Sequence, residues 1–185
     1  MIRSNFTAEL HCQHGQVVVV DTAFADHLFT SADEDGWLST ERAKPTGFKR
    51  VDFSFQFIKH EGDRTHYFIT CAQSWDYAGA RLEQNKNGWL GLYGTHVIGR
   101  IIDAINPSNL LRPTDFWKIE TLQPWDGDVQ SAQNIEFYLR DKYGHRVSQA
   151  LPSSETITLS HDTFLNAGKH KGEILKFKLR NIQLA

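Results

Sequence analysis

Three short aromatic segments recur along this chain at a spacing of about 60 residues, and this recurrence restricts the fold more than any other feature. They are Phe53–Phe57, Phe116–Ile119 and Phe177–Arg180. A Gly-Trp-Leu word stands upstream of the first two, at Gly36–Ser39 and Gly88–Gly91. Together these matches predict three similar units, because an internal repeat normally marks one supersecondary module that is used several times.

Strands account for nearly all of the predicted structure. Aromatic and β-branched residues occur in short runs bounded by Gly, Asn, Asp or Pro, which is typical of strands between turns. Helical periodicity is weak, and Val97–Ile105 is the best candidate for a helical turn. The expected strands are Glu9–Gln13, Gln16–Asp21, one beginning at Gly36, Asp52–Ile58, His66–Cys71, Ala80–Glu83, Trp89–Tyr93, Asp115–Glu120, Ile135–Leu139, Arg146–Gln149, Glu155–Leu159 and Ile174–Arg180.

The predicted units cover about residues 6–62, 63–124 and 125–185, within a single domain spanning 1–185. One unit of four strands cannot bury both faces of its own sheet, so the three units have to share a core. Closing them around a threefold axis removes the exposed sheet edges. The second unit carries an insertion at Gly94–Pro113, and the third lacks the Gly-Trp-Leu word.

The chain resembles the β-trefoil superfamily, most closely its fascin-like and lectin-like branches. The Gly-Trp-Leu words and the closing strands at Asp52–Phe53 and Asp115–Ile119 carry this resemblance. It implies an all-β trefoil of three four-stranded repeats, with Trp37, Trp89 and Trp117 in the core. The alternative architecture is an antiparallel β-sandwich or jelly roll.

Composition limits the partners. A formal net charge of −2 over 185 residues supplies no field for nucleic acid or an anionic membrane. No run approaches the length of about 18 apolar residues that a membrane helix needs, and the first residues lack a signal-peptide core. We therefore expect a soluble, cytoplasmic protein without membrane insertion, with leaderless export left open. Cys12 and Cys71 are expected to be buried free thiols, although a disulfide between them stays open.

No catalytic signature is found. The nine histidines show no metal-ligand spacing, and no serine occupies a Gly-x-Ser-x-Gly elbow. The acidic pairs at Asp33–Asp35 and Asp126–Asp128 are typical of solvated turns. We therefore predict no catalytic residue, no metal and no cofactor, and a protein that is not an enzyme.

Aromatic rings beside amide and acid side chains in loops give the functional hypothesis. Aromatic faces stack on the C–H faces of sugars, while amides and acids bind paired hydroxyls. This chemistry predicts a carbohydrate-binding, lectin-like protein, unless Trp75 and Trp125 only cap the barrel. The candidate ligand-binding residues are Gln73, Trp75, Asp76, Tyr77, Asn85, Asn87, Trp125 and Asp126.

Two alternative functions stay open. The resemblance to fascin-like proteins implies a module that binds another protein or a filament. Trefoils also serve as toxin components and protease inhibitors, in which case the Gly94–Pro113 loop would carry the activity. The sequence therefore leaves a glycan or a protein as the ligand, and it leaves the oligomeric state open.

Overall fold

The computed structural model describes residues 1–185 except 22–33, 44–46, 74–76, 94–114, 152–162 and 169–170, and at Asp21, Glu34, Asp35 and Gln73 it describes the backbone alone. Strands dominate the described residues, so the all-β prediction is confirmed. The only helical elements in this part of the chain are two short 3₁₀ turns, η2 (Glu41–Ala43) and η3 (Ala132–Asn134). The expected strand at Glu155–Leu159 and the helical turn at Val97–Ile105 lie outside the described residues.

Most strands lie where alternation of the sequence predicts them. The strands in chain order are β1 (Phe6–Cys12), β2 (Gly15–Asp21), β3 (Glu34–Thr40), β4 (Phe48–Arg50), β5 (Asp52–Glu61), β6 (Arg64–Gln73), β7 (Arg81–Gln84), β8 (Leu90–Tyr93), β9 (Trp117–Thr121), β10 (Phe137–Arg140), β11 (Ser148–Ala150), β12 (Phe164–Asn166), β13 (Glu173–Ile174) and β14 (Lys178–Leu184).

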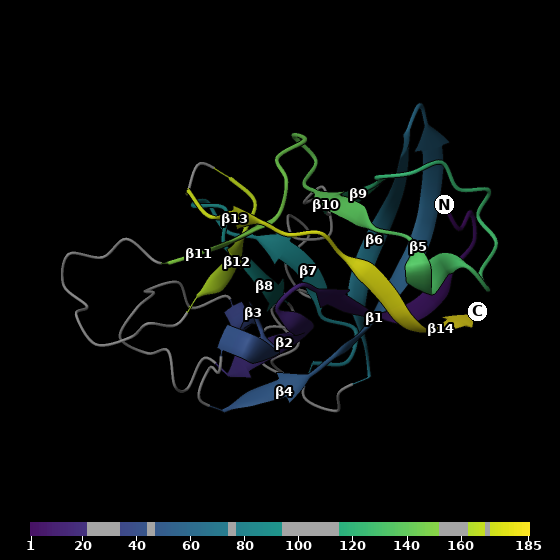
Figure 1. Cartoon of the computed structure of the whole chain (residues 1–185). Helices are drawn as coiled ribbons and strands as arrows, with labels where there is room; N and C mark the ends of the chain where they lie inside the picture. The colour runs from purple at the N-terminus through teal and green to yellow at the C-terminus, as the bar shows by residue number, and fades with distance from the viewer. Residues whose placement is uncertain (22–33, 44–46, 74–76, 94–114, 152–162, 169–170) are drawn as a thin grey trace, which may run out of the picture.

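Seven antiparallel strands close into a barrel (Figure 1). The ring runs β1, β2, β3, β8, β7, β6 and β5, and β5 returns to β1. Pairing of Thr70 with Arg81, together with the hydrogen bond from Cys71 N to Ala80 O at 2.8 Å, joins β6 to β7 and completes the circle. Outside the ring, β9 pairs with β6 and β10 with β9, while β14 lies along β1 and β4 along β2. Closure leaves no free edge within the barrel itself.

The β-trefoil prediction is wrong, because the thirds of the chain do not occupy equivalent places. The two Gly-Trp-Leu words lie on adjacent antiparallel strands, where Trp37 of β3 pairs with Gly91 of β8. The closing strands are not equivalent either: β5 and β9 flank the same strand β6, whereas β14 pairs with β1. The recurring words are short strand patterns that fit any half-buried sheet. The fold agrees with the coarser part of the prediction, an all-β protein of antiparallel sheets, and the larger sheet is closed into a barrel.

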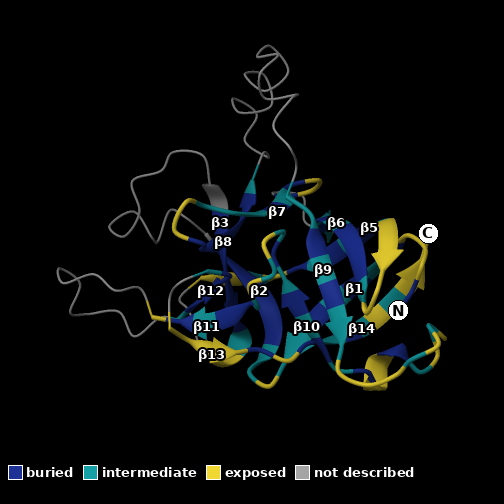
Figure 2. Cartoon of the chain, turned by 90° about the horizontal axis from the view of Figure 1, so that it is seen from above, coloured by how far each residue is buried: buried dark blue, intermediate teal, exposed yellow. Residues whose placement is uncertain are grey.

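Aromatic side chains fill the barrel. Phe6 stacks on Phe55 with ring centroids 4.6 Å apart, and Tyr67 meets both rings edge-on. All three are buried, and Figure 2 shows the buried residues gathered along the barrel strands. Trp117 is fully buried on β9, and its indole N–H donates to Leu82 O at 2.8 Å. Burial of Trp37, Trp89 and Trp117, which the sequence predicts, is confirmed.

A small sheet of β12, β11 and β13 packs against one side of the barrel. Its contact with β3 and β8 forms a second apolar cluster containing Val20, Trp37, Trp89, Ala150 and Phe164. An isolated bridge from Trp89 to Asn166 joins the two layers. This junction sets the position of the turn between β7 and β8, where the pocket described below opens.

Both cysteines are free thiols, and no disulfide joins them. Cys71 is buried as expected, whereas Cys12 is only partly buried at the end of β1. Burial nevertheless raises the pKa of the Cys12 thiol to about 11. In the described parts of the chain, no helix is long and apolar enough to cross a membrane.

Candidate functional site

The aromatic cluster expected at Gln73–Tyr77 lies largely outside the described residues. Trp75 and Asp76 fall in the gap at 74–76, and Gln73 ends β6 with only its backbone described. Tyr77 is buried, with 5% of its surface exposed. Its ring packs beside Gly36 of β3, where an added Cβ would lie 3.2 Å from Tyr77 Cε1. Tyr77 therefore does not offer the exposed stacking face that the sugar-site hypothesis assigned to it.

The second expected cluster, at Trp125 and Asp126, is a loop packed against the core. Trp125 is half-buried, and its indole N–H donates to Ser131 Oγ at 2.8 Å. Asp126 is exposed, and its Oδ1 accepts the backbone N–H of Asp128 at 2.9 Å in an Asx turn. These contacts give both side chains a structural role in the loop, away from the pocket that Asn85 and Asn87 line.

Asn85 and Asn87 form the tight turn between β7 and β8, as their sequence predicts. Asn85 Oδ1 accepts the backbone N–H groups of Asn87 and Trp89 at 2.9 and 3.0 Å. Asn85 is therefore occupied in shaping the turn. The Asn87 side chain is exposed at the tip of the turn. Both residues line one open pocket, so the structure brings them to a concave surface.

This pocket has a volume of about 590 Å³ and four walls that are distant in sequence. The turn between β7 and β8 supplies the first wall, and the turn after β10 supplies the second. The segment after β12 and a residue preceding β9 complete it. The lining residues are Gln84, Asn85, Lys86, Asn87, Gly88, Asp115, Asp141, Lys142, Tyr143, His145, Ala167 and Gly168. Most of the lining side chains carry polar groups, while Ala167, the Tyr143 ring and the methylene stems of Lys86 and Lys142 supply apolar surface.

Asp141 organises the turn after β10. Its side chain is 1% exposed, and its Oδ1 accepts the backbone N–H of His145 at 2.7 Å. Its Oδ2 lies 2.8 Å from His145 Nδ1 and accepts Gln84 Nε2 at 3.3 Å. Because a carboxylate only accepts, the imidazole proton in this pair belongs on Nδ1. Asp141 therefore links its own turn to β7 through these hydrogen bonds.

Lys142 and Tyr143 project from the same turn. Lys142 Nζ donates to Asp115 Oδ1 at 2.7 Å, and this bond raises the pKa of the lysine above its ordinary value. The ammonium also lies 5.2 Å from the centroid of the Tyr143 ring. Tyr143 is 71% exposed, a large fraction for an aromatic residue. The Lys142–Asp115 ion pair therefore lies beside the Tyr143 ring, and this ring extends into solvent at the opening of the pocket.

Backbone contacts with the segment after β12 fix the opposite wall. Ala167 N donates to Gly88 O at 2.8 Å, and Asn166 Nδ2 donates to Asn87 O at 3.1 Å. Gly88 has φ +84°, and a Cβ there would lie 3.0 Å from Ala167 O. Only glycine satisfies both the left-handed backbone and this close approach. The turn that carries Asn87 is therefore fixed relative to the small sheet.

Two amide oxygens at this site have no hydrogen-bond partner. They are Oε1 of Gln84, which lines the pocket, and Oδ1 of Asn166, which lies behind Gly168. The amide orientation is set in each case, because Nε2 of Gln84 and Nδ2 of Asn166 donate to oxygen acceptors. A buried acceptor without a donor costs free energy, and of the two residues only Gln84 lines the pocket.

With the imidazole proton on Nδ1, His145 Nε2 is the basic ring nitrogen of this pocket. The two carboxylates of the pocket are already engaged, Asp115 with Lys142 and Asp141 with His145 and Gln84. Among the residues described, no three His, Cys, Asp or Glu side chains are grouped closely enough to hold a metal ion. The arrangement can bind a polar ligand by hydrogen bonds and can stack a ring on Tyr143.

Sequence reasoning found the first wall of this pocket and missed the second. It selected Asn85 and Asn87, but it left Lys142–His145 as a connection between two expected strands. The missed signal was an aromatic ring within a short polar turn, Asp141–His145, which is the same pattern that selected Trp75. The proximity of this turn to Asn87 depends on the tertiary fold.

The fold and the pocket together define an all-β barrel protein with a polar surface site. No family model matches the chain. The search of curated proteins likewise found no match.

Proposed function

We propose that this chain is a non-catalytic carbohydrate-binding protein whose ligand occupies the pocket between the β7–β8 turn and the turn after β10. The observation that carries the proposal is an exposed Tyr143 ring beside a cavity lined by Gln84, whose amide oxygen has no hydrogen-bond partner. A sugar offers the two complementary features in one molecule: a C–H face for the ring and hydroxyl donors for the oxygen.

Size and charge support a neutral polyhydroxylated ligand. The volume of about 590 Å³ falls within the range of about 300–1,000 Å³ that small-molecule sites occupy. Lys86 and Lys142 are balanced in the lining by Asp115 and Asp141. An apolar ligand would leave these groups desolvated without partners, whereas hydroxyls can replace the water they lose.

Binding requires one local adjustment. Gln84 Oε1 is shielded from solvent, so binding requires the amide to leave its present orientation and turn toward the cavity. Gln84 is only half-buried, and its single contact to Asp141 is long at 3.3 Å. This bond is weak enough to exchange for a ligand hydroxyl.

A glycan array followed by calorimetry on the best ligand tests the proposal. Tyr143→Ala should weaken binding about five- to tenfold, from the loss of about 1–1.5 kcal/mol of ring contact. Tyr143→Phe should retain most of the affinity, because it keeps the ring. Asn87→Ala should weaken binding without loss of stability, since the exposed Asn87 side chain is not used in the turn.

Phe48→Ala is the matched control, because Phe48 is an exposed aromatic residue on β4, outside the pocket lining. An array without any bound glycan would contradict the proposal, and so would equal losses in Tyr143→Ala and Phe48→Ala. The Trp75 cluster stays a prediction, and Trp75→Ala on the same array tests it separately.

A further inference from the structure

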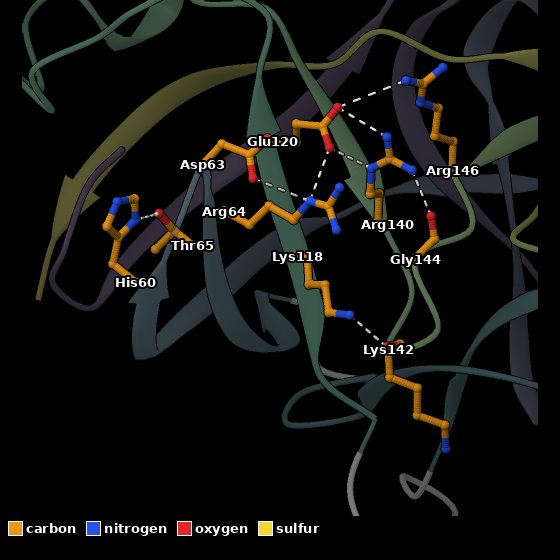
Figure 3. Close-up of polar contacts among 10 residues, drawn as sticks. All are labelled: His60, Asp63, Arg64, Thr65, Lys118, Glu120, Arg140, Lys142, Gly144 and Arg146. Carbon is orange, nitrogen blue, oxygen red and sulfur yellow. Dashed lines mark hydrogen bonds and ion pairs between the residues drawn. The ribbon is translucent and has the colours of Figure 1, made fainter.

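Cationic side chains gather on the outer face of the β6–β9–β10 ribbon (Figure 3). In this register Arg64 of β6 and Tyr138 of β10 both pair with Glu120 of β9. Alternation turns Trp117 and Ile119 into the core and leaves Lys118 and Glu120 on the opposite face. We use the name arginine face for the surface formed by Arg64, Lys118, Glu120, Arg140 and Arg146.

Glu120 is the anchor of the arginine face. Arg140 grips it with two bonds, Nε to Oε2 at 2.7 Å and Nη2 to Oε1 at 3.0 Å. Arg64 adds a bond from Nε to Oε2 at 3.1 Å. The pKa of Glu120 is lowered first by the bond from Arg140 and also by Arg64, so the carboxylate stays ionised. Arg140 is therefore engaged through all three of its nitrogens, because its Nη1 also donates to Gly144 O at 2.6 Å.

Positive charge remains in excess on this surface. Asp63, which is 74% exposed, lies 3.6 Å from Arg64 Nε and is the second carboxylate here. Four cationic groups thus stand against two carboxylates, which leaves two positive charges uncompensated. The pKa of the neighbouring His66 is lowered first by burial and then by the positive charges of Lys59 and Lys118.

Arg146 and Arg64 hold unused donors. The Arg146 guanidinium lies 4.1 Å from the centroid of the Tyr138 ring, which fixes its plane. Its Nη2 is 3.9 Å from Glu120 Oε1, and its buried Nε has no hydrogen-bond partner. Among the described residues, Arg64 contacts carboxylates through Nε alone, which leaves its two terminal nitrogens available. Guanidinium groups fixed in this way favour planar, multidentate recognition of oxyanions.

We propose that the arginine face binds a tetrahedral oxyanion, a sulfate or phosphate group, through Arg64 and Arg146 beside the Glu120–Arg140 pair. Nucleic-acid strands fit the site less well, because bases need free rings for stacking. The Tyr138 ring is covered by Arg146, and the Phe116 ring is stacked on His66 at 5.3 Å. The site is independent of the carbohydrate pocket, since Tyr143 and the amides take no part in it.

Solution NMR on the full chain tests the proposal through the arginine Nε–H signals, with sodium sulfate or sodium phosphate titrated at constant ionic strength against sodium chloride. Saturable shifts are expected at Arg64 and Arg146. Arg146→Gln should weaken sulfate binding about tenfold, the equivalent of one charge-assisted hydrogen bond. Glu120→Gln should strengthen it, because that change removes the competing carboxylate.

Arg180→Gln is the matched control, since within the described part of the chain its guanidinium bonds to the Gln133 amide and it lies outside the arginine face. Arg146→Lys keeps the positive charge but removes the planar guanidinium group, so it should weaken sulfate binding less than Arg146→Gln does. This difference between the two variants distinguishes a loss of oxyanion recognition from a loss of folding. Dextran sulfate compared with dextran distinguishes an ester group on a polymer from the free ion.

Saturable binding of sulfate, phosphate or dextran sulfate that Arg146→Gln weakens and Arg180→Gln preserves supports the proposal. Shifts that stay linear and match those of sodium chloride overturn it. Equal losses in Arg146→Gln and Arg180→Gln overturn it as well.

Discussion

Replacing Asp141 by asparagine should destabilise the chain and loosen the pocket. The carboxylate is 1% exposed and faces three N–H donors: backbone N and Nδ1 of His145 and Nε2 of Gln84. Asparagine has one acceptor oxygen, so in either orientation its NH₂ group confronts at least one donor. Hydrogen bonds to a charged group contribute about 1.5–3 kcal/mol each.

The expected magnitude follows from the geometry. In the orientation that keeps the 2.7 Å bond from His145 N, the variant loses the 2.8 Å and 3.3 Å contacts at Oδ2. Relief of the desolvation of a buried charge offsets part of that loss. We expect a net decrease of about 3 kcal/mol in the free energy of unfolding. With a slope of about 2 kcal/mol/M, the urea midpoint should fall by about 1.5 M.

Urea denaturation followed by tryptophan fluorescence measures this change, and Asp126→Asn is its control. Asp126 is exposed, and its Oδ1 accepts a single backbone N–H, which an asparagine oxygen accepts equally well in an Asx turn. The control should stay within about 0.5 kcal/mol of the parent protein. Asp141→Asn with an unchanged midpoint would refute the view that this carboxylate organises the turn.

Two further predictions concern the turn between β7 and β8 and the arginine face. Gly88→Ala should lower Tm by about 4–8 °C, because a strained backbone and a methyl 3.0 Å from Ala167 O together cost about 2 kcal/mol. Gly79→Ala, at φ +78° with open space around it, should cost only the free energy of the strained backbone. Equal decreases in Tm for the two variants would contradict a steric contribution at Gly88. The lowered pKa of Glu120 predicts a stability contribution that is complete above the ordinary glutamate pKa and is lost as the pH falls through the folded value. Urea midpoints measured across acidic pH should show this loss, and Glu120→Gln should reduce it.

The local structure could be predicted because its causes are local. Alternation at Phe53 and Phe55 marks the buried face of β5, and both side chains are fully buried. The Asn85–Gly88 turn follows from residues that tolerate a left-handed backbone, and Gly88 has φ +84°. Burial of Trp37 likewise follows from its place in a β-branched and aromatic sheet.

The topology could not be predicted in the same way, because strand pairing depends on register between distant segments. Trp37 and Trp89 belong to the same Gly-Trp-Leu word, yet Trp37 lies on β3 and Trp89 directly precedes the neighbouring strand β8. Neither Gly-Trp-Leu word indicates by itself whether the two segments lie on adjacent strands or at positions related by a threefold axis. The same reason hid the second wall of the pocket, since Tyr143 and Asn87 line one pocket because β10 pairs with β9 and β12 packs on the barrel.

One turn separates the two proposed sites. Tyr143 lies on the side of the turn that faces the pocket. The other side of the turn is bonded to the arginine face, because Arg140 Nη1 donates to Gly144 O and Lys118 Nζ donates to Lys142 O, both at 2.6 Å. Because these bonds use backbone oxygens, substitutions at the Tyr143 ring leave them intact. Tyr143→Ala should therefore weaken glycan binding and keep sulfate binding, and Arg146→Gln should weaken sulfate binding and keep glycan binding. A variant that lost both would indicate that the turn itself had moved, as we expect for Asp141→Asn.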